Sequence, residues 1–269
     1  VDLLQDIHSE GYCGGLIFTW QDEWFKRTWN TMDFDLADRR AYWSNPQTNE
    51  QEFGLMAFEP GEEESAHYVD GDISDWSKAE PITETEDGSL FAASDEKYLY
   101  LMVETDGFAF GADTLSIPID TIADQGNTAA TEQQLQFTSG ADFLIRIAGE
   151  GDARIMVDSY YDSFYYLYAE QLGMLAKNPA YTVKDSGLFN PMLHCLSREI
   201  FLPASQQTVP FSSYETGLLY LGDANPEHDD YNSLTDYAVK DGNVEIRIPW
   251  QLLNVMDPSA KQIMGDLYE

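Results

Sequence analysis

Residues 68–76 read YVDGDISDW and gather oxygen-bearing side chains around a single glycine, Gly71. The oxygens belong to Asp70, Asp72, Ser74 and Asp75, at a spacing that could bind calcium. An EF-hand loop would also need a glycine at its sixth position and a glutamate at its twelfth, and this stretch has neither. We therefore favour the alternative, in which Asp70 and Asp75 cap turns and Trp76 buries its ring beneath a β-sandwich.

A second acidic stretch, residues 222–232, reads GDANPEHDDYN. Oxygen-bearing side chains occur at every second position, which would let one loop wrap a hard cation such as calcium. The candidate metal ligands are Asp223, Asn225, Glu227 and Asp229. The closing glutamate and the central glycine of an EF-hand are again absent, so a solvated acidic loop is the alternative.

The composition restricts the partners of the chain. Its 269 residues include 48 acidic and 14 basic ones, for a formal net charge of −34. A field of this sign repels nucleic acid and anionic lipid, and no apolar run has the length of a membrane span, so we expect neither partner.

The sequence starts at Val1, which indicates a piece of a longer polypeptide. Cys13 and Cys195 are predicted to be buried free thiols rather than a disulfide.

A charged segment with proline and glycine divides the chain into two parts. Residues 2–10 have the pattern of a short helix, and 14–20 (GGLIFTW) that of a strand buried on both faces. EPGEEES, at 59–65, is the best candidate for a linker. We therefore predict a short α/β appendage over 1–58 and a separate domain over 59–269.

Beyond the linker the pattern predicts antiparallel β-structure. Hairpins are expected at 89–104, 141–160 and 235–250, the last folded at Asp241-Gly242. In the last of these, alternate residues (244, 246 and 248 against 245 and 247) should face the core and the solvent. The predicted fold class is mainly β: an antiparallel β-sandwich of jelly-roll or immunoglobulin type, with one helix at 164–176.

Four short motifs follow one another in this second part. They are VDGDISDW (69–76), SDEKYLYLMVETD (94–106), SIPIDT (116–121) and VEIRIPWQLL (244–253). Their order resembles that of family 9 carbohydrate-binding modules and the related DOMON-type sandwiches. The resemblance covers residues 66 to about 256, although the insert at 160–235 has no counterpart. It implies a β-sandwich that binds carbohydrate, with Trp76 and Trp250 as core residues.

In such modules sugar rings stack on aromatic side chains, and polar groups bind the hydroxyls. One aromatic cluster lies in the loop TDGFAFGAD and the other follows the second hairpin. The predicted carbohydrate-binding residues are Phe108, Phe110, Arg146, Tyr160, Tyr161 and Tyr165, with Arg154 beside Arg146 on a paired strand. The alternative is that the tyrosines form a secondary core and that the arginines pair with Asp158 and Glu245.

The first 58 residues carry a separate resemblance. GGLIFTW followed by QDEW is similar to the eighth strand of (β/α)8-barrel glycoside hydrolases. In those enzymes an aromatic residue at the end of this strand forms the floor of a sugar subsite, and the resemblance gives Trp20 that place. Asp22 and Glu23 follow that strand, but adjacent residues of an extended chain point apart. Glycoside hydrolysis needs two carboxylates about 5–10 Å apart. Catalysis by this chain alone is therefore not expected.

Together these observations predict a non-catalytic, carbohydrate-binding C-terminal region of a larger secreted or cell-surface glycan-processing protein. The expected partners are a poly- or oligosaccharide and an upstream catalytic domain of the same polypeptide. Two alternatives stay open: a glycoside hydrolase whose barrel is completed by residues 1–58, and a structural spacer stabilised by calcium.

Overall fold

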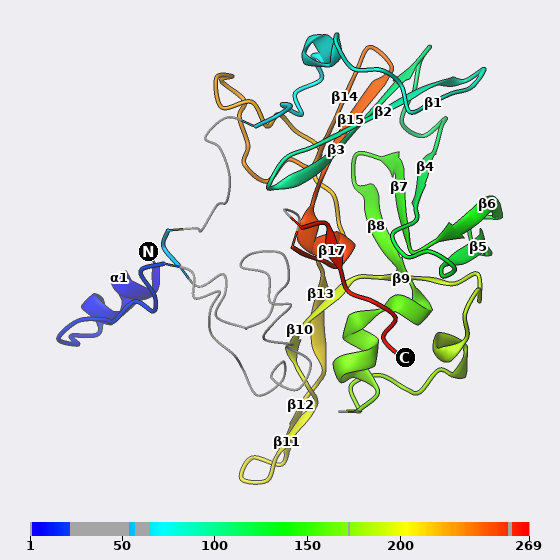
Figure 1. The fold of residues 1–269 in the computed structure, drawn as a ribbon. Helices are drawn as coiled ribbons and strands as arrows, with labels where there is room; N and C mark the ends of the chain where they lie inside the picture. The colour runs from blue at the N-terminus through cyan, green and yellow to red at the C-terminus, as the bar shows by residue number, and fades with distance from the viewer. Residues whose placement is uncertain (1, 22–53, 57–64, 172, 258–259, 269) are drawn as a thin grey trace.

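A computed structural model describes residues 2–21, 54–56, 65–171, 173–257 and 260–268 (Figure 1). The N-terminal helix α1 (Asp2–Ser9) forms as predicted and buries none of its residues. Residues 14–20 form no strand, and the side chains of Leu16, Ile17 and Trp20 are exposed, which corrects the expected buried strand. The Cys13 thiol is also exposed rather than buried. Asp22 and Glu23 and most of the predicted linker lie outside the described residues.

The protein is mainly β, and its body is an antiparallel β-sandwich, as the sequence predicts. The first sheet has the order β1-β2-β3-β15-β14. Its strands are β1 (Thr83–Glu84), β2 (Gly88–Ser94), β3 (Tyr98–Thr105), β14 (Tyr237–Lys240) and β15 (Asn243–Pro249). β14 and β15 are joined at Asp241 and Gly242, which have φ values of 52° and 85°. Positive φ at both central residues is the requirement of a type I′ hairpin turn, so the predicted turn is confirmed.

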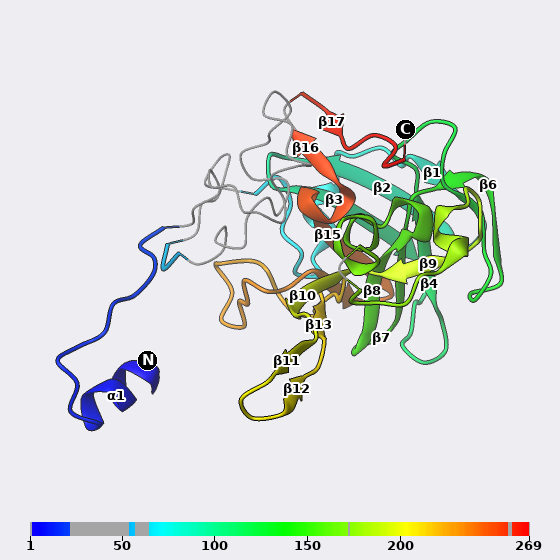
Figure 2. The same ribbon diagram turned by 90° about the horizontal axis from the view of Figure 1, so that it is seen from below.

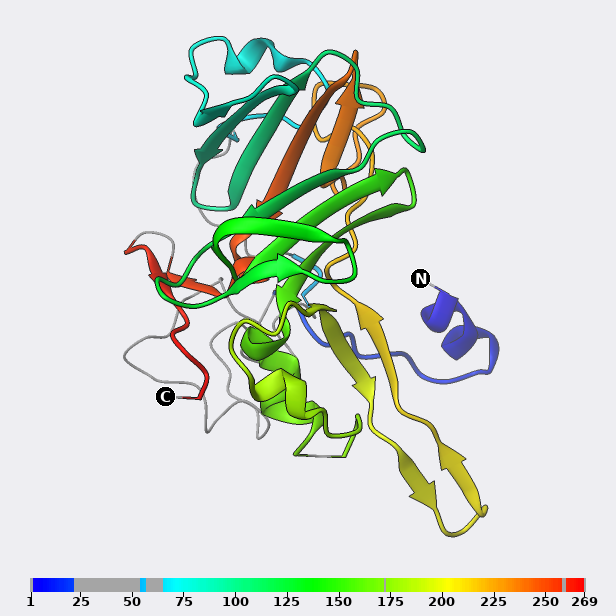
Figure 3. The ribbon, with the colours of Figure 1, turned by 90° about the vertical axis from the view of Figure 1, so that its right-hand side faces the viewer.

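The second sheet has the order β4-β7-β8-β9. Its strands are β4 (Leu115–Ile119), β7 (Phe143–Gly149), β8 (Asp152–Asp158) and β9 (Phe189–Pro191). The two sheets bury one main core between them, to which Leu101, Val103, Val244, Ile246, Ile248, Phe143, Ile145, Ile147, Ile155 and Val157 contribute. Figure 3 shows the first sheet, in teal and orange, above the green strands of the second.

Both outer faces of the sandwich are covered over part of their area. β5 (Asn127–Ala130) and β6 (Leu135–Ala141) form a hairpin whose Ala130 and Ala141 pack with Leu144 of β7 and Met156 of β8. On the other side, residues 69–79 cover the outer face of the first sheet with Val69 and Trp76, which pack with Tyr100 and Met102 of β3. Consecutive residues in the middle of the central strands are therefore buried on both faces, as in Tyr100–Val103 of β3 and Val244–Ile248 of β15.

The buried outer face corrects one expectation from the strand pattern. Glu245 and Arg247 of β15, which the alternation assigns to solvent, are 1% and 9% exposed. Arg247 donates hydrogen bonds to the carbonyl oxygens of Thr235 (2.7 Å) and Ser233 (2.9 Å) and lies over the ring of Tyr98. These partners satisfy a guanidinium group that would otherwise be costly to bury.

The insert at 160–235 adds short helices and two-stranded ribbons. The predicted helix at 164–176 is shorter than expected: a π-helical turn, η3 (Tyr165–Ala169), which follows the 3-10 turn η2 (Ser159–Tyr161) and precedes the 3-10 turn η4 (Pro179–Thr182). β10 (Leu193–Ser197) pairs with β13 (Ser212–Glu215), and β11 (Ile200–Leu202) pairs with β12 (Gln207–Val209). Figures 1 and 2 both show the β11–β12 ribbon extending away from the sandwich.

The C-terminal segment packs back onto the core. The 3-10 turn η5 (Trp250–Leu253) follows β15, and β16 (Val255–Asp257) then pairs with β17 (Gln262–Ile263). Trp250 is half-buried against the main core, and its indole N–H donates to the carbonyl oxygen of Asp95 (2.9 Å). Trp76 is 3% exposed. Both tryptophans therefore serve the core, as predicted. Among the described residues, no helix combines the length and the apolar character needed to cross a membrane.

Candidate functional site

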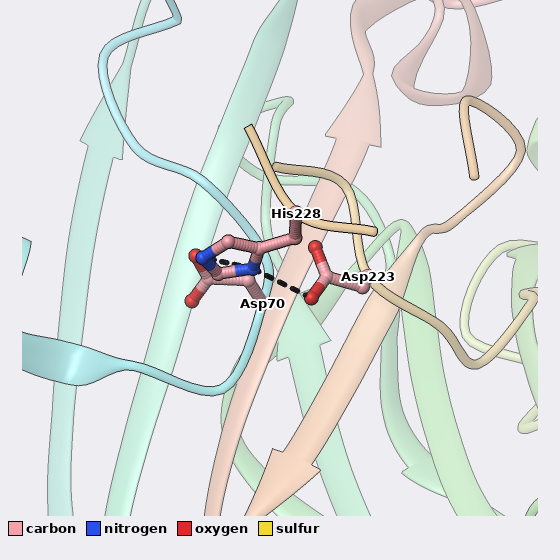
Figure 4. A group of neighbouring side chains, drawn as sticks. All are labelled: Asp70, Asp223 and His228. Carbon is pink, nitrogen blue, oxygen red and sulfur yellow. Dashed lines mark hydrogen bonds and ion pairs between the residues drawn. The ribbon is translucent and has the colours of Figure 1, made fainter. Parts of the chain in front are cut away.

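Two loops that are far apart in the sequence meet over the first sheet. The first contains η1 (Ile73–Trp76) and the turn that precedes it, and the second connects β13 to β14. The backbone N–H of Ala224 donates to the carbonyl oxygen of Val69 (2.8 Å), which ties the loops together. Beside this bond the side chains of Asp70, Asp223 and His228 converge (Figure 4). One potential metal-binding atom from each lies within 4.8 Å of the others.

Glu245 of β15 holds the first loop in place. Its Oε2 accepts hydrogen bonds from the backbone N–H groups of Gly71 (2.7 Å) and Asp70 (3.3 Å). Its Oε1 accepts one from the indole Nε1 of Trp76 (2.9 Å). Gly71 has a φ of +83°, and a Cβ at this position would lie 2.8 Å from the Cβ of Lys240. Only glycine fits this turn, because a side chain would be both strained and too close to β14.

The remaining acids of the first motif stabilise its turns. An Asp70 oxygen accepts from the backbone N–H of Asp72 (2.7 Å), and Asp72 accepts from that of Ser74 (3.0 Å) at the start of η1. Asp75 accepts from the backbone N–H of Tyr68 (3.2 Å) and lies 3.2 Å from the Nδ1 of His67. The turn-capping interpretation of this stretch is confirmed, although Asp70 also joins the group with Asp223 and His228.

The second loop arranges its polar side chains around Asn225. The Nδ2 of Asn225 donates to Asp70 (2.8 Å), and its backbone N–H donates to Asp223 (2.8 Å). The Nδ1 of His228 lies 2.8 Å from Asp223 and 3.8 Å from Asp70. A backbone bond from His228 to the carbonyl oxygen of Asn225 (3.0 Å) places the imidazole above both carboxylates.

Two groups of the site have shifted titration behaviour. The hydrogen bond to Asp223, reinforced by the charges of Asp223 and Asp70, raises the pKa of His228. Burial raises the pKa of Glu245 to about 7, although its bonds from Gly71 and Trp76 oppose the shift. His228 therefore keeps its proton to a higher pH than an ordinary imidazole, and Glu245, which positions Asp70, changes charge near pH 7.

The side chains of Asp70, Asp223 and His228 could bind a cation together. Two carboxylates and an imidazole form a ligand set that suits zinc and similar transition ions, whereas calcium prefers oxygen ligands throughout. A protonated His228 can bridge Asp70 and Asp223 in the same place as such an ion. The geometry thus provides for a positive charge between the two aspartates, supplied by either a metal or a proton.

The predicted metal ligands are only partly brought together. Asp223 belongs to the group, and Asn225 bonds to it through Asp70. Glu227 and Asp229 are exposed and belong to no metal-ligand group found among the described residues. Sequence reasoning missed Asp70 and His228 as companions of Asp223. No local pattern could reveal them, because Asp70 lies in a different loop and His228 breaks the every-second-position rule.

The structure places the predicted sugar-stacking tyrosines in the interior. Tyr160, Tyr161 and Tyr165 are 5%, 0% and 1% exposed. Tyr161 belongs to the main core, and Tyr165 packs with Phe164 and Ala169 in a small cluster of its own. Because no ring face is open to a ligand, these three tyrosines are core residues, which corrects their expected role.

The other predicted binding residues are engaged at the edge of the sandwich. Phe108 and Phe110 are half-buried against the main core, with their ring centroids 5.6 Å apart. Arg146 donates to both carboxylate oxygens of Asp152 (2.9 Å each). Arg154 pairs with Glu215 (3.3 Å). The arginines thus pair with acids, as the alternative supposed, but their partners are not the Asp158 and Glu245 that it named.

Two exposed tyrosines lie in the loop that carries Asp223 and His228. Tyr220 is 55% exposed and Tyr231 is 47% exposed, and both belong to the β13–β14 connection. The backbone of Tyr231 forms an isolated parallel β-bridge with that of Asp223, and its N–H donates to the carbonyl oxygen of His228 (3.2 Å). Its place within GDANPEHDDYN was visible in the sequence, but nothing there distinguishes an exposed tyrosine from a buried one.

No protein-family model, curated protein or solved structure matches the chain.

Proposed function

We propose that the β-sandwich is a non-catalytic glycan-binding module of a larger secreted or cell-surface glycan-processing protein. The order of the four motifs that resemble family 9 carbohydrate-binding modules supports this proposal. The observation that carries it is in the β13–β14 connection, where Tyr231, whose side chain is 47% exposed, forms a backbone β-bridge with Asp223 of the candidate site. An exposed ring beside hydrogen-bonding groups is the combination that binds sugars.

Each part of this surface has a role in the proposed complex. The phenol ring of Tyr231 packs against the apolar face of a pyranose, and Tyr220 extends the contact along the same connection. Asp223 and Asn225 exchange hydrogen bonds with hydroxyl groups. This assignment replaces the buried tyrosines with residues whose rings are about half exposed and have no ring contact in the described part of the chain.

The proposed partner for catalysis is a domain of the same polypeptide. The exposed apolar side chains of Leu16, Ile17 and Trp20 provide a surface that such a domain would bury. In the enzymatic alternative the same segment completes a glycosidase barrel. The two proposals differ in whether this chain contributes to catalysis. The alternative needs a pair of catalytic acids, and its candidates Asp22 and Glu23 lie outside the described residues.

A cation-stabilised spacer is the second candidate function, and the Asp70–Asp223–His228 group favours it. In this proposal an ion between the two loops fixes them over the first sheet. Calcium would use the carboxylates of Asp70 and Asp223 with waters, whereas a transition ion would also bind the imidazole.

Affinity electrophoresis through gels that contain soluble glycans tests the main proposal. We expect retardation by at least one glycan, and weaker retardation of Tyr231→Ala and Tyr220→Ala. Phe201→Ala is the matched control, because Phe201 is a similarly exposed aromatic (55%) on the distant β11–β12 ribbon. Unchanged migration with every glycan would exclude the module and favour the spacer.

A further inference from the structure

Two aspartates lie directly opposite each other in the interior of the second sheet. Asp142 precedes β7, and Asp158 ends β8; the register pairs Phe143 with Val157, so the aspartates occupy the next position of the ladder. The backbone N–H of Asp158 donates to the carbonyl oxygen of Asp142 (2.7 Å). Opposite residues of an antiparallel pair have Cβ atoms about 4.5–5.5 Å apart on the same face. Both residues are 0% exposed, so two carboxylates share one dry environment.

The donors around these carboxylates are neutral. One oxygen of Asp142 accepts from the backbone N–H groups of Thr121 (2.7 Å) and Ile122 (2.8 Å), and the other accepts from the Nε2 of Gln125 (3.3 Å). Asp158 Oδ1 accepts from the Nδ2 of Asn127 (2.9 Å). Within the described residues, no lysine, arginine or histidine forms an ion pair with either aspartate. The negative charge of this cluster is therefore not balanced by the protein.

Two oxygen atoms of the cluster have no hydrogen-bond partner. They are Asp158 Oδ2 and Gln125 Oε1, and both are fully buried. The Gln125 amide is held against Asp142 through its nitrogen, so its oxygen belongs to the same cluster. Buried acceptors without a donor are rare in native proteins, because their lost hydration is not replaced.

We propose that Asp142, Asp158 and Gln125 bind an oxygen-coordinated cation of the calcium class. A cation contacts the two unpartnered oxygens and removes the repulsion between the opposed carboxylates. The donor set contains carboxylate and amide oxygens without imidazole or thiolate, which is the set that hard cations select. The site is distinct from the Asp70–Asp223–His228 group and does not depend on glycan binding. It would link the β7–β8 hairpin to the loop that precedes β5.

The test compares thermal melting of the full chain in chelator and in calcium chloride. Calcium at about one hundred times its Kd should raise the melting temperature by about 5–10 °C. Asp158→Asn should lose this rise, because the variant lacks one charge and one ligand oxygen. Asp223→Asn should keep it, because that carboxylate belongs to the other group. Glu132→Gln controls for the loss of one acidic charge, since Glu132 is exposed in the turn between β5 and β6.

Two outcomes would overturn the proposal. One is an Asp158→Asn variant that keeps the full calcium-dependent rise, and it would mean that the stabilising calcium binds elsewhere. The other is the reverse pattern, in which Asp223→Asn alone loses the rise. If Asp158→Asn does not fold, equilibrium dialysis decides: wild type and Asp223→Asn should each retain one equivalent of calcium. No retained calcium in wild type, or its loss in Asp223→Asn, contradicts the site.

Discussion

The indole Nε1 of Trp76 donates a 2.9 Å hydrogen bond to Oε1 of Glu245, although 169 positions separate the two residues in the sequence. The same carboxyl group accepts from the backbone N–H of Gly71 through its other oxygen. The first and the last of the four motifs are therefore joined inside the protein. Glu245 thus holds Asp70 beside Asp223 and His228. The same residue stabilises both the packing of the sandwich and the candidate site.

Replacement of Glu245 should weaken the whole domain. Glu245→Ala leaves the buried N–H groups of Trp76 and Gly71 without an acceptor, and we expect a loss of about 2–4 kcal/mol in the free energy of unfolding. Urea denaturation followed by tryptophan fluorescence measures this change. Glu104→Ala on the neighbouring strand β3 is the control, because Glu104 is exposed, and it should cost less than about 0.5 kcal/mol. Equal losses in the two variants would contradict the role of Glu245.

Stability should fall as the pH rises from 5 to 8. Burial raises the pKa of Glu245 to about 7 from an ordinary value of 4.5, so the folded state holds a proton that the unfolded state has released. The stability linked to that proton is present below the unfolded pKa and is lost as the pH rises through 7. For Glu245 the loss is on the order of 2–3 kcal/mol. Asp158, with a pKa raised by burial to about 7, and Asp236, raised by burial to about 6, act in the same direction.

Thermal melting across this pH range, in chelator, checks the prediction. Glu245→Gln cannot titrate and should show a shallower decline than wild type. A melting temperature that rises between pH 5 and pH 8 would show that these carboxyl groups are ionised in the folded protein at lower pH than the structure implies.

Gly71→Ala should destabilise the turn that carries Asp70. The backbone has a positive φ, and the new Cβ would meet Lys240, so we expect a cost of about 1–3 kcal/mol. Gly111→Ala is the matched control: its φ is +79°, and nothing lies within 4 Å of the added Cβ. The difference between the two melting temperatures isolates the contact with β14. No difference would indicate that the backbone conformation alone matters.

Binding of a transition ion at the Asp70–Asp223–His228 group should compete with protons. An ion that occupies the imidazole displaces its proton, so zinc affinity should weaken as the pH falls through the raised pKa of His228. Isothermal titration with zinc at several pH values measures this. His228→Ala should remove the pH dependence, whereas His8→Ala, on the exposed helix α1, should leave it unchanged. Zinc binding that persists at full strength in His228→Ala would place the ion elsewhere.

Local signals in the sequence were sufficient for much of the fold. Asp241-Gly242 specifies a hairpin because both residues accept a positive φ, and the motif residues Trp76 and Trp250 were assigned to the core correctly. The strand pattern failed at Glu245, because a loop from another part of the chain covers the face that alternation assigns to solvent. The run at 14–20 failed in the opposite sense, since the apolar side chains of Leu16, Ile17 and Trp20 are exposed.

The candidate site was less predictable for the same reason. Asp223 was identified from its loop, but its pairing with Asp70 depends on how two remote loops pack against the first sheet. Tyr161 and Tyr231 have similar neighbours in the sequence, yet one is in the core and the other is exposed. Burial is decided by tertiary packing, which spacing alone does not encode.

The most direct test of the proposed function is to measure the Kd of the full chain for the glycan that retards it most, by isothermal titration calorimetry. We predict that Tyr231→Ala raises the Kd at least about tenfold, equivalent to about 1.4 kcal/mol, and that Phe201→Ala leaves it unchanged. An unchanged Kd for Tyr231→Ala, or an equal increase for Phe201→Ala, would contradict the assignment of glycan binding to this surface.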